Sequence, residues 1–270
     1  METLCVIPVR AIISEAEMKH EAPSNALRNS SDHESSTSSV CSDHLDCDNW
    51  GPAVFVERHG FADILAANEM RHMAPNYDMV TLLEEIVEVE TEHDPVFVVN
   101  LSTVMSQLYI WKRMMPCIQP FYAVICKGDD AITRMLSELG CGFDCACKAE
   151  IAAALSFGCP ADLIIYANPC TQASMLRYAR SVGVKKMTAD NIEELQKNNS
   201  VFPEAHVVLR IAVDDSNSVC RCNSKFGAPR HEWEAMLESS REIGIEVVGF
   251  SFRVGSGCDE LKVRCAKLEV

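Results

Sequence analysis

The feature that most constrains the fold is a regular alternation of short apolar runs with longer amphipathic stretches between residues 120 and 252. The apolar runs have the length of strands, and the stretches between them, about ten to fifteen residues long, have the length of helices. This alternation is typical of βαβ units that build a parallel sheet. We expect strands in FYAVIC, GFDCA, LIIY, KKMTA, HVVLRI and EVVGFSF. We expect helices over residues 130–140, 147–157, 171–182, 190–198 and 230–243.

Residues that commonly mark helix ends support these boundaries. Asp129 and Asp130 stand at the start of the first expected helix, and Gly140 stands at its end. Thr171 and Asp190 are candidate N-caps of two later helices. The sequence therefore predicts an α/β fold.

Composition limits the classes of protein that this chain can be. With 270 residues, 48% of them hydrophobic, the chain can bury one sizeable core. No apolar run approaches the ~18 residues of a membrane span, and the first residues lack the basic start of a signal peptide, so we expect a cytoplasmic protein without a membrane partner. The net charge of −15 argues against nucleic acid as a partner.

The fourteen cysteines lie mostly within expected strands and helices of a long chain, which favours thiols over disulfides. Two C-x-C pairs, Cys145 with Cys147 and Cys220 with Cys222, could in principle bind zinc. No histidine pattern accompanies either pair, so we expect no metal site.

The chain divides into three parts by composition. Residues 1–49 include a polar, acidic, serine-rich tract over 30–39, and we interpret this part as a disordered tail. Residues 50–93 form an ordered N-terminal extension with a helix-like TLLEEIVEVE segment. Residues 94–270 contain the alternating pattern and form the main domain.

Five blocks within the main domain carry a resemblance to a known family. They are PFYAV (120–124), GFDCACKAE (142–150), IIYANPC (164–170), VVLRIAVDDS (207–216) and GFSFRVGSGC (249–258). In this order and at these intervals the chain resembles eukaryotic ornithine decarboxylase and its non-catalytic relative, antizyme inhibitor. The resemblance implies a (β/α)8 TIM-type barrel of the alanine-racemase-like kind followed by a β-rich C-terminal domain. About six of the eight barrel strands are expected here, and the C-terminal domain is expected to be absent.

An incomplete barrel has a physical consequence. A closed barrel has no strand edges, whereas a six-strand barrel exposes two edges and part of its apolar interior. We therefore expect such a chain to be of marginal stability when isolated.

The resemblance implies a site for pyridoxal phosphate, which the family holds through a lysine imine. Ile125 stands at the position of that lysine, and isoleucine has no amine. Lys127 is two residues further on, about 7 Å along an extended strand. Arg253 stands where the family stacks a histidine on the cofactor ring. We therefore predict that this chain has no catalytic residues and does not bind the family's cofactor.

Other residues match the family's supporting positions around the cofactor. We interpret them as inherited scaffold, and their occupancy by a cofactor is doubtful on the sequence alone. They are Ala123, Asp144, Glu150, Arg210 and Ser256. Two alternatives to a pseudoenzyme stay open, namely a pyridoxal-phosphate-dependent ornithine decarboxylase represented by an incomplete gene product, and a non-functional duplicate.

A basic run in an acidic protein indicates a partner surface. Residues 171–186 contain four basic residues and no acid, and Lys197 follows them. The four are Arg177, Arg180, Lys185 and Lys186. The resemblance aligns this stretch with the region that binds antizyme, so the hypothesis is an antizyme-binding protein of polyamine metabolism.

The resemblance also bears on dimerisation. Lys225 matches a family lysine that meets an acidic residue of the partner's C-terminal domain, and that domain is expected to be absent here. The family-type homodimer is therefore not expected.

Overall fold

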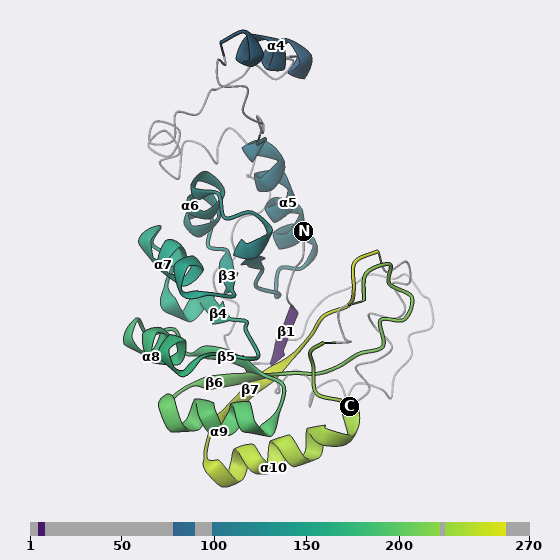
Figure 1. Ribbon diagram of the computed structural model, residues 1–270. Helices are drawn as coiled ribbons and strands as arrows, with labels where there is room; N and C mark the ends of the chain where they lie inside the picture. Colours follow the sequence, from purple (N-terminus) through teal and green to yellow (C-terminus); the bar gives the residue numbers. More distant parts are fainter. Residues whose placement is uncertain (1–4, 9–77, 90–98, 222–224, 258–270) are drawn as a thin grey trace, which may run out of the picture. The chain divides into compact units, whose positions relative to one another are not determined.

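The computed structural model describes residues 5–8, 78–89, 99–221 and 225–257 (Figure 1). The chain divides into two compact units. The first consists of Met1–Asp43 with Cys117–Val270, and the second of His44–Pro116.

A seven-stranded sheet forms the centre of the first unit, in the order β1-β7-β6-β5-β4-β3-β2. Strands β2 to β7 follow one another in sequence and are all parallel, as the alternating pattern predicts. The strands are β1 (Cys5–Pro8), β2 (Phe121–Ala123), β3 (Gly142–Cys145), β4 (Ile164–Tyr166), β5 (Lys186–Ala189), β6 (His206–Arg210) and β7 (Glu246–Phe252). This arrangement confirms the predicted partial barrel with six parallel strands.

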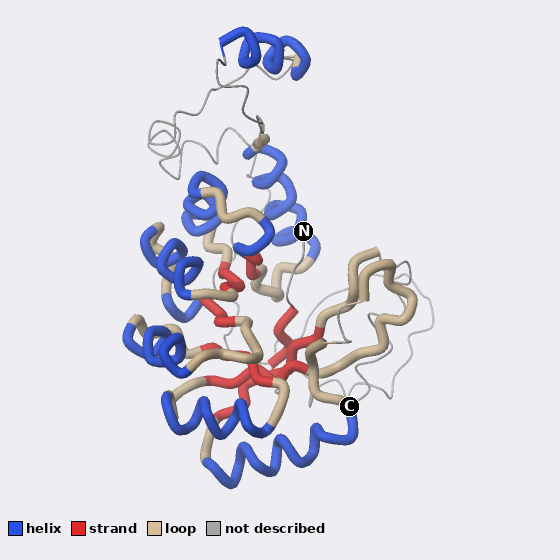
Figure 2. Tube along the Cα trace, viewed as in Figure 1, coloured by secondary structure: helices blue, strands red, loops and turns tan. Residues whose placement is uncertain are grey.

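Five helices connect the parallel strands and run along the outer face of the curved sheet (Figures 1 and 2). Each lies within a predicted range or within three residues of it. They are α6 (Asp130–Glu138), α7 (Lys148–Ser156), α8 (Ala173–Ser181), α9 (Ile192–Val201) and α10 (Trp233–Ile243). Short 3-10 turns occur at η2 (Val124–Cys126), η3 (Ala161–Leu163) and η4 (Arg230–Glu232).

The second unit contains two described helices. The TLLEEIVEVE segment lies largely within α4 (Met79–Val89), as predicted. Helix α5 (Leu101–Met114) is absent from the sequence-based expectations. Its N-cap is Asn100, whose side chain accepts a hydrogen bond from the Thr103 N–H.

Helix caps agree only partly with the sequence. The Asp129 carboxylate accepts hydrogen bonds from the first backbone N–H groups of α6, as expected. The cap of α9 is Asn191 and not Asp190, since the Asn191 side chain accepts from the Glu194 N–H at 2.7 Å. Thr171 does not cap α8, because its hydroxyl donates to the carbonyl oxygen of Asn168.

The apolar core has two layers, one on each face of the sheet. Phe121, Ile165 and Val208 pack together on the inner face with Val248. The outer layer joins β5, β6 and β7 to helices α9 and α10. Its buried members are Ala189, Leu195, Val207, Leu209, Ile211, Ala228, Met236, Ile245 and Phe250.

Two expectations about the strands need correction. The strand expected to run through Lys127 ends at Ala123, and the next three residues form the turn η2. The edge of β7 that was expected to be open pairs with β1 in antiparallel register, from Cys5 opposite Phe252 to Pro8 opposite Gly249.

The tail predicted over residues 1–49 lies outside the described residues, apart from the strand segment at 5–8. Most of the 50–93 extension also lies outside them. Among the helices that the structure describes, none is long and apolar enough to cross a membrane.

Candidate functional site

The parallel strands bring most of the predicted cofactor positions to one edge of the sheet. Side chains alternate between the two faces of a strand, and the carboxyl ends of parallel strands share one edge. We call the group at this edge the carboxyl-edge site. It comprises Ala123, Ile125, Asp144, Glu150, Arg210, Arg253 and Ser256.

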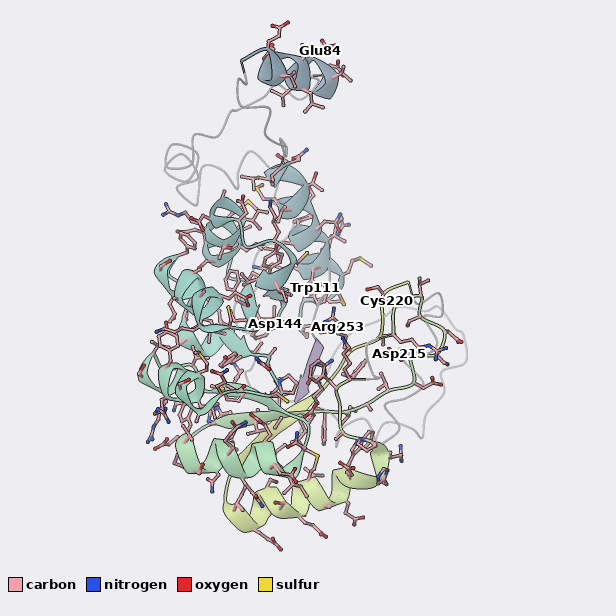
Figure 3. The ribbon with its side chains drawn as sticks, viewed as in Figure 1. Glu84, Trp111, Asp144, Asp215, Cys220 and Arg253 are labelled. Atoms are coloured by element: carbon pink, nitrogen blue, oxygen red, sulfur yellow. The ribbon has the colours of Figure 1, made fainter. Side chains whose placement is uncertain are left out.

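Strand register fixes the neighbours on the inner face. Ala123 is the register partner of Asp144, and Asp144 is the partner of Ile165, which belongs to the inner layer. Asp144 is half-buried and projects from β3, and Arg253, also half-buried, follows the end of β7 (Figure 3). The structure therefore places an acidic and a basic side chain at the same edge of one sheet.

Glu150 is held by the local fold. It lies in the first turn of α7, and its carboxylate accepts a hydrogen bond of 2.6 Å from the Ala146 N–H. A carboxylate at this position also compensates the partial positive charge of the helix N-terminus. Glu150 therefore shapes the turn between β3 and α7, a role that needs no ligand.

Arg210, at the end of β6, also contacts the protein itself. Its guanidinium lies 5.1 Å from the ring centroid of Phe226. The neighbouring Gly227 donates its N–H to the Asp190 carboxylate at 3.0 Å and adopts a φ of 102°. Any side chain at this glycine would strain the backbone, so Asp190 and Gly227 together fix the loop that carries Phe226.

Ser256 lies after β7 and forms an antiparallel bridge with Cys220, in the loop after β6. The Cys220 N–H donates to the Ser256 carbonyl oxygen at 3.1 Å. A Cβ atom on Gly255 would lie 2.1 Å from the Cys220 carbonyl oxygen. Glycine is required here because two backbone segments meet, and the Ser256 side chain stays exposed.

Ile125 lies in the turn η2 directly after β2, and 69% of its surface is exposed. The turn is fastened by the buried Tyr122, whose hydroxyl donates to the Lys127 carbonyl oxygen at 3.0 Å. Burial is the main cause that raises the pKa of Tyr122 to about 12. Because the chain turns at Val124, the expected spacing of Lys127 along a straight strand was wrong.

These residues do not fit a covalently attached pyridoxal phosphate. An imine requires a nitrogen, and the alkyl side chain of Ile125 has none. The carboxylate of Glu150 and the guanidinium of Arg210 already have partners within the protein.

The predicted partner-binding residues do not share one environment. Arg177 and Lys185 are exposed. Arg180 is exposed but forms an ion pair of 2.8 Å with Glu204 and donates to the Val201 carbonyl oxygen. The run is free of acid along the sequence, yet the fold brings an acid to it.

Two other lysines of that group are oriented inward or engaged. Lys197 pairs at 2.5 Å with the carboxylate of the buried Glu194, which also accepts the Thr171 N–H. Lys186 is half-buried, and its amine donates to the Asp162 carbonyl oxygen. The exposed basic surface is therefore smaller than the sequence suggests.

Comparison with known proteins identifies the family. The family described as pyridoxal-dependent decarboxylase, pyridoxal binding domain, matches residues 101–269. The chain belongs to the pyridoxal-dependent decarboxylase family. Ornithine decarboxylase of Mus musculus is 44% identical over 179 residues, covering 66% of this chain and 39% of that protein. Antizyme inhibitor 2 of Xenopus laevis is 42% identical over 184 residues, covering 68% of this chain and 40% of that protein.

Solved structures of decarboxylases share the fold. The arginine decarboxylase of Paramecium bursaria Chlorella virus superposes with a TM-score of 0.65 at 30% identity, covering 68% of this chain and 50% of that one. Ornithine decarboxylase from Entamoeba histolytica gives a TM-score of 0.54 at 27% identity, covering 65% and 49%. The chain thus spans about two fifths of the length of these two relatives and about half of these two structures.

Sequence reasoning missed three residues that organise this decarboxylase-like sheet. Asp190 orders the Phe226 loop, Phe226 supports Arg210, and Glu194 ties α9 to the start of α8. Asp190 follows directly after an expected strand, and an acid at a strand end is a usable signal. For Phe226 and Glu194 the partners are distant in sequence, so spacing offers no comparable signal.

Proposed function

We propose that this chain is a non-catalytic member of polyamine metabolism that acts by binding antizyme. The main support for a non-catalytic role is Ile125. An exposed alkyl side chain stands where the resemblance expects the cofactor lysine. Without an amine there, the chain has no internal imine from which a decarboxylase could exchange its substrate.

The proposed binding of antizyme rests on two exposed basic side chains. In a protein of net charge −15, Arg177 on α8 and Lys185 before β5 are exposed and lie in the segment that the resemblance aligns with antizyme binding. Exposed opposite charges guide association at long range and contribute little to affinity individually. The relatives include a protein named antizyme inhibitor 2, which supports this reading.

The experiment measures association with immobilised antizyme at several salt concentrations. The Arg177→Glu/Lys185→Glu variant should associate about tenfold more slowly, because two attractive charges become repulsive. The wild-type rate should fall as salt rises. Lys186 and Lys197 are left unchanged in this test, because both are engaged within the fold.

A matched control tests whether the position of the charge reversal, and not the change in net charge, slows association. Arg241 is an exposed arginine in the last turn of α10, and Arg241→Glu changes the net charge as Arg177→Glu does. The control should bind antizyme at nearly the wild-type rate. Failure of the wild type to bind at micromolar concentration, or equal loss in Arg177→Glu and Arg241→Glu, would remove the proposal.

The catalytic alternative has its own observation and test. Asp144, Glu150, Arg210 and Ser256 remain at the carboxyl-edge site, as a cofactor pocket would need. Full-length protein supplied with pyridoxal phosphate and labelled ornithine should release no carbon dioxide above the level of a heat-inactivated sample. Sustained release that depends on the cofactor would establish an enzyme.

A further inference from the structure

The opposite, amino-terminal end of the sheet carries a row of three ionisable side chains that the proposed function does not use. Strand register aligns Lys186 of β5 with His206 of β6, and His206 with Glu246 of β7. Neighbouring parallel strands lie about 4.8 Å apart, so Lys186 and His206 stand side by side. We call these three residues the amino-end row.

The row faces the inside of the sheet. Ile165, the register partner of Lys186 on β4, belongs to the inner apolar layer. Val208 lies two residues after His206 and belongs to the same layer, and residues two apart on a strand share a face. Lys186 therefore points toward the inner layer and not toward the helical exterior.

Both an apolar ring and a polar backbone group surround the Lys186 amine. Its nitrogen lies 5.8 Å from the ring centroid of Phe121 and donates to the Asp162 carbonyl oxygen. Burial lowers the pKa of Lys186, and the Asp162 carboxylate opposes this effect without reversing it. A larger share of this amine is consequently neutral and nucleophilic than in an exposed lysine.

A second ionisable pair stands at the starts of the next two strands, β6 and β7. The His206 imidazole nitrogen Nε2 lies 3.4 Å from a Glu246 carboxylate oxygen, and both side chains reach solvent. Imidazole is suited to accepting and returning protons near neutral pH. Within the described part of the chain, Asp162, from η3, is the charged group that acts on the amine, and the His206–Glu246 pair lies on the next two strands.

We propose that Lys186 is a reactive amine that condenses with small, uncharged aromatic aldehydes at the amino end of the sheet. The lone pair of the amine attacks the carbonyl carbon and forms a C–N bond. Both amine hydrogens end on the carbonyl oxygen, which leaves as water, and a C=N bond remains. His206 relays these protons, and Phe121 offers an apolar ring beside the aldehyde. The acids Asp162 and Glu246 disfavour aldehydes that carry a negative charge.

The test uses full-length protein, pyridoxal as the uncharged aldehyde and sodium cyanoborohydride as the reductant that traps the imine. Peptide mapping by mass spectrometry then gives the labelling rate of each lysine. Lys186 should be labelled at least fivefold faster than the adjacent, exposed Lys185. In urea-unfolded protein the two lysines should react alike, because the difference arises from the fold.

Two variants sharpen the test. Lys186→Arg should remove the fast adduct and leave the slow labelling of other lysines unchanged. His206→Gln should slow the trapping at Lys186 several-fold, while an acylating ester, whose reaction needs no loss of water, still labels Lys186 at the wild-type rate. Equal labelling of Lys185 and Lys186 in the folded wild type would overturn the inference, whatever the outcome with antizyme.

Discussion

Lys197 should act on stability and not on partner binding, and the structure allows the size of the effect to be estimated. Its amine lies 2.5 Å from the Glu194 carboxylate. The side chain of Glu194 is 5% exposed, whereas that of Lys197 is 35% exposed. Lys197→Met keeps most of the apolar stem and removes the charge. Among the described residues, the buried Glu194 carboxylate then keeps the hydrogen bond from the Thr171 N–H.

Breaking a fully buried ion pair costs roughly 3–5 kcal/mol. Because Lys197 is partly exposed, water can replace some of the lost interaction, and we expect a loss of about 1–3 kcal/mol. The Arg177→Met control changes an exposed side chain and should stay within about 0.5 kcal/mol of the wild type. Glu194→Gln combined with Lys197→Met should recover most of the loss, since a neutral amide needs no counter-charge.

Urea unfolding followed by far-UV circular dichroism measures these differences. With a slope of about 1–3 kcal/mol per molar urea, the Lys197→Met midpoint should fall by roughly 1 M. If Lys197→Met unfolds at the same urea concentration as Arg177→Met, the pair with Glu194 contributes nothing and the reasoning is wrong. A Lys197 variant that weakens antizyme binding without any loss of stability would return this residue to the partner surface.

Three further predictions concern stability, alkaline pH and backbone contact. Asn198 is 1% exposed, and its amide nitrogen and oxygen have no hydrogen-bond partner within the described part of the chain, so Asn198→Leu should stabilise the protein by about 1–3 kcal/mol in the same urea assay. Because the pKa of Tyr122 is raised to about 12, the folded state keeps a proton that the unfolded state loses. Stability should therefore decline from about pH 10, the ordinary tyrosine pKa, toward pH 12, and less steeply in Tyr122→Phe. Gly255→Ala should speed proteolysis near Cys220, because the new Cβ would collide with the Cys220 carbonyl oxygen.

The regular part of the fold follows from local sequence. Apolar runs such as LIIY and HVVLRI form β4 and β6 because they can be buried on both faces of a parallel sheet. The pairing of β1 with β7 joins segments more than 200 residues apart, and no local pattern encodes such a contact. The early end of β2 has a similar cause, since the hydrogen bond from Tyr122 to the Lys127 carbonyl depends on a turn that the β-branched run Val124–Ile125 does not suggest.

The sequence predicts where the residues of the carboxyl-edge site lie along the strands, but not the contacts that they make. Ala123, Asp144 and Arg210 lie at or near the ends of β2, β3 and β6, and parallel strands present their carboxyl ends at one edge. Their role around a cofactor stays a prediction. The basic run was harder, since Glu204 and Glu194 approach its cations only after folding. Charge counted along a sequence therefore overestimates the charge that a partner meets.

Family membership and activity rest on different residues in this chain. The shared blocks consist mainly of strand and turn residues whose packing and backbone contacts preserve the sheet, and a sheet of this kind hosts many functions. The proposed lack of catalysis depends on the position that the resemblance aligns with the cofactor lysine, where this chain has Ile125 in the turn η2. An amine elsewhere in the same sheet, at Lys186, has a different set of neighbours and faces the opposite end. The condensation proposed for Lys186 would therefore use Phe121, Asp162 and His206, and not the residues of the carboxyl-edge site.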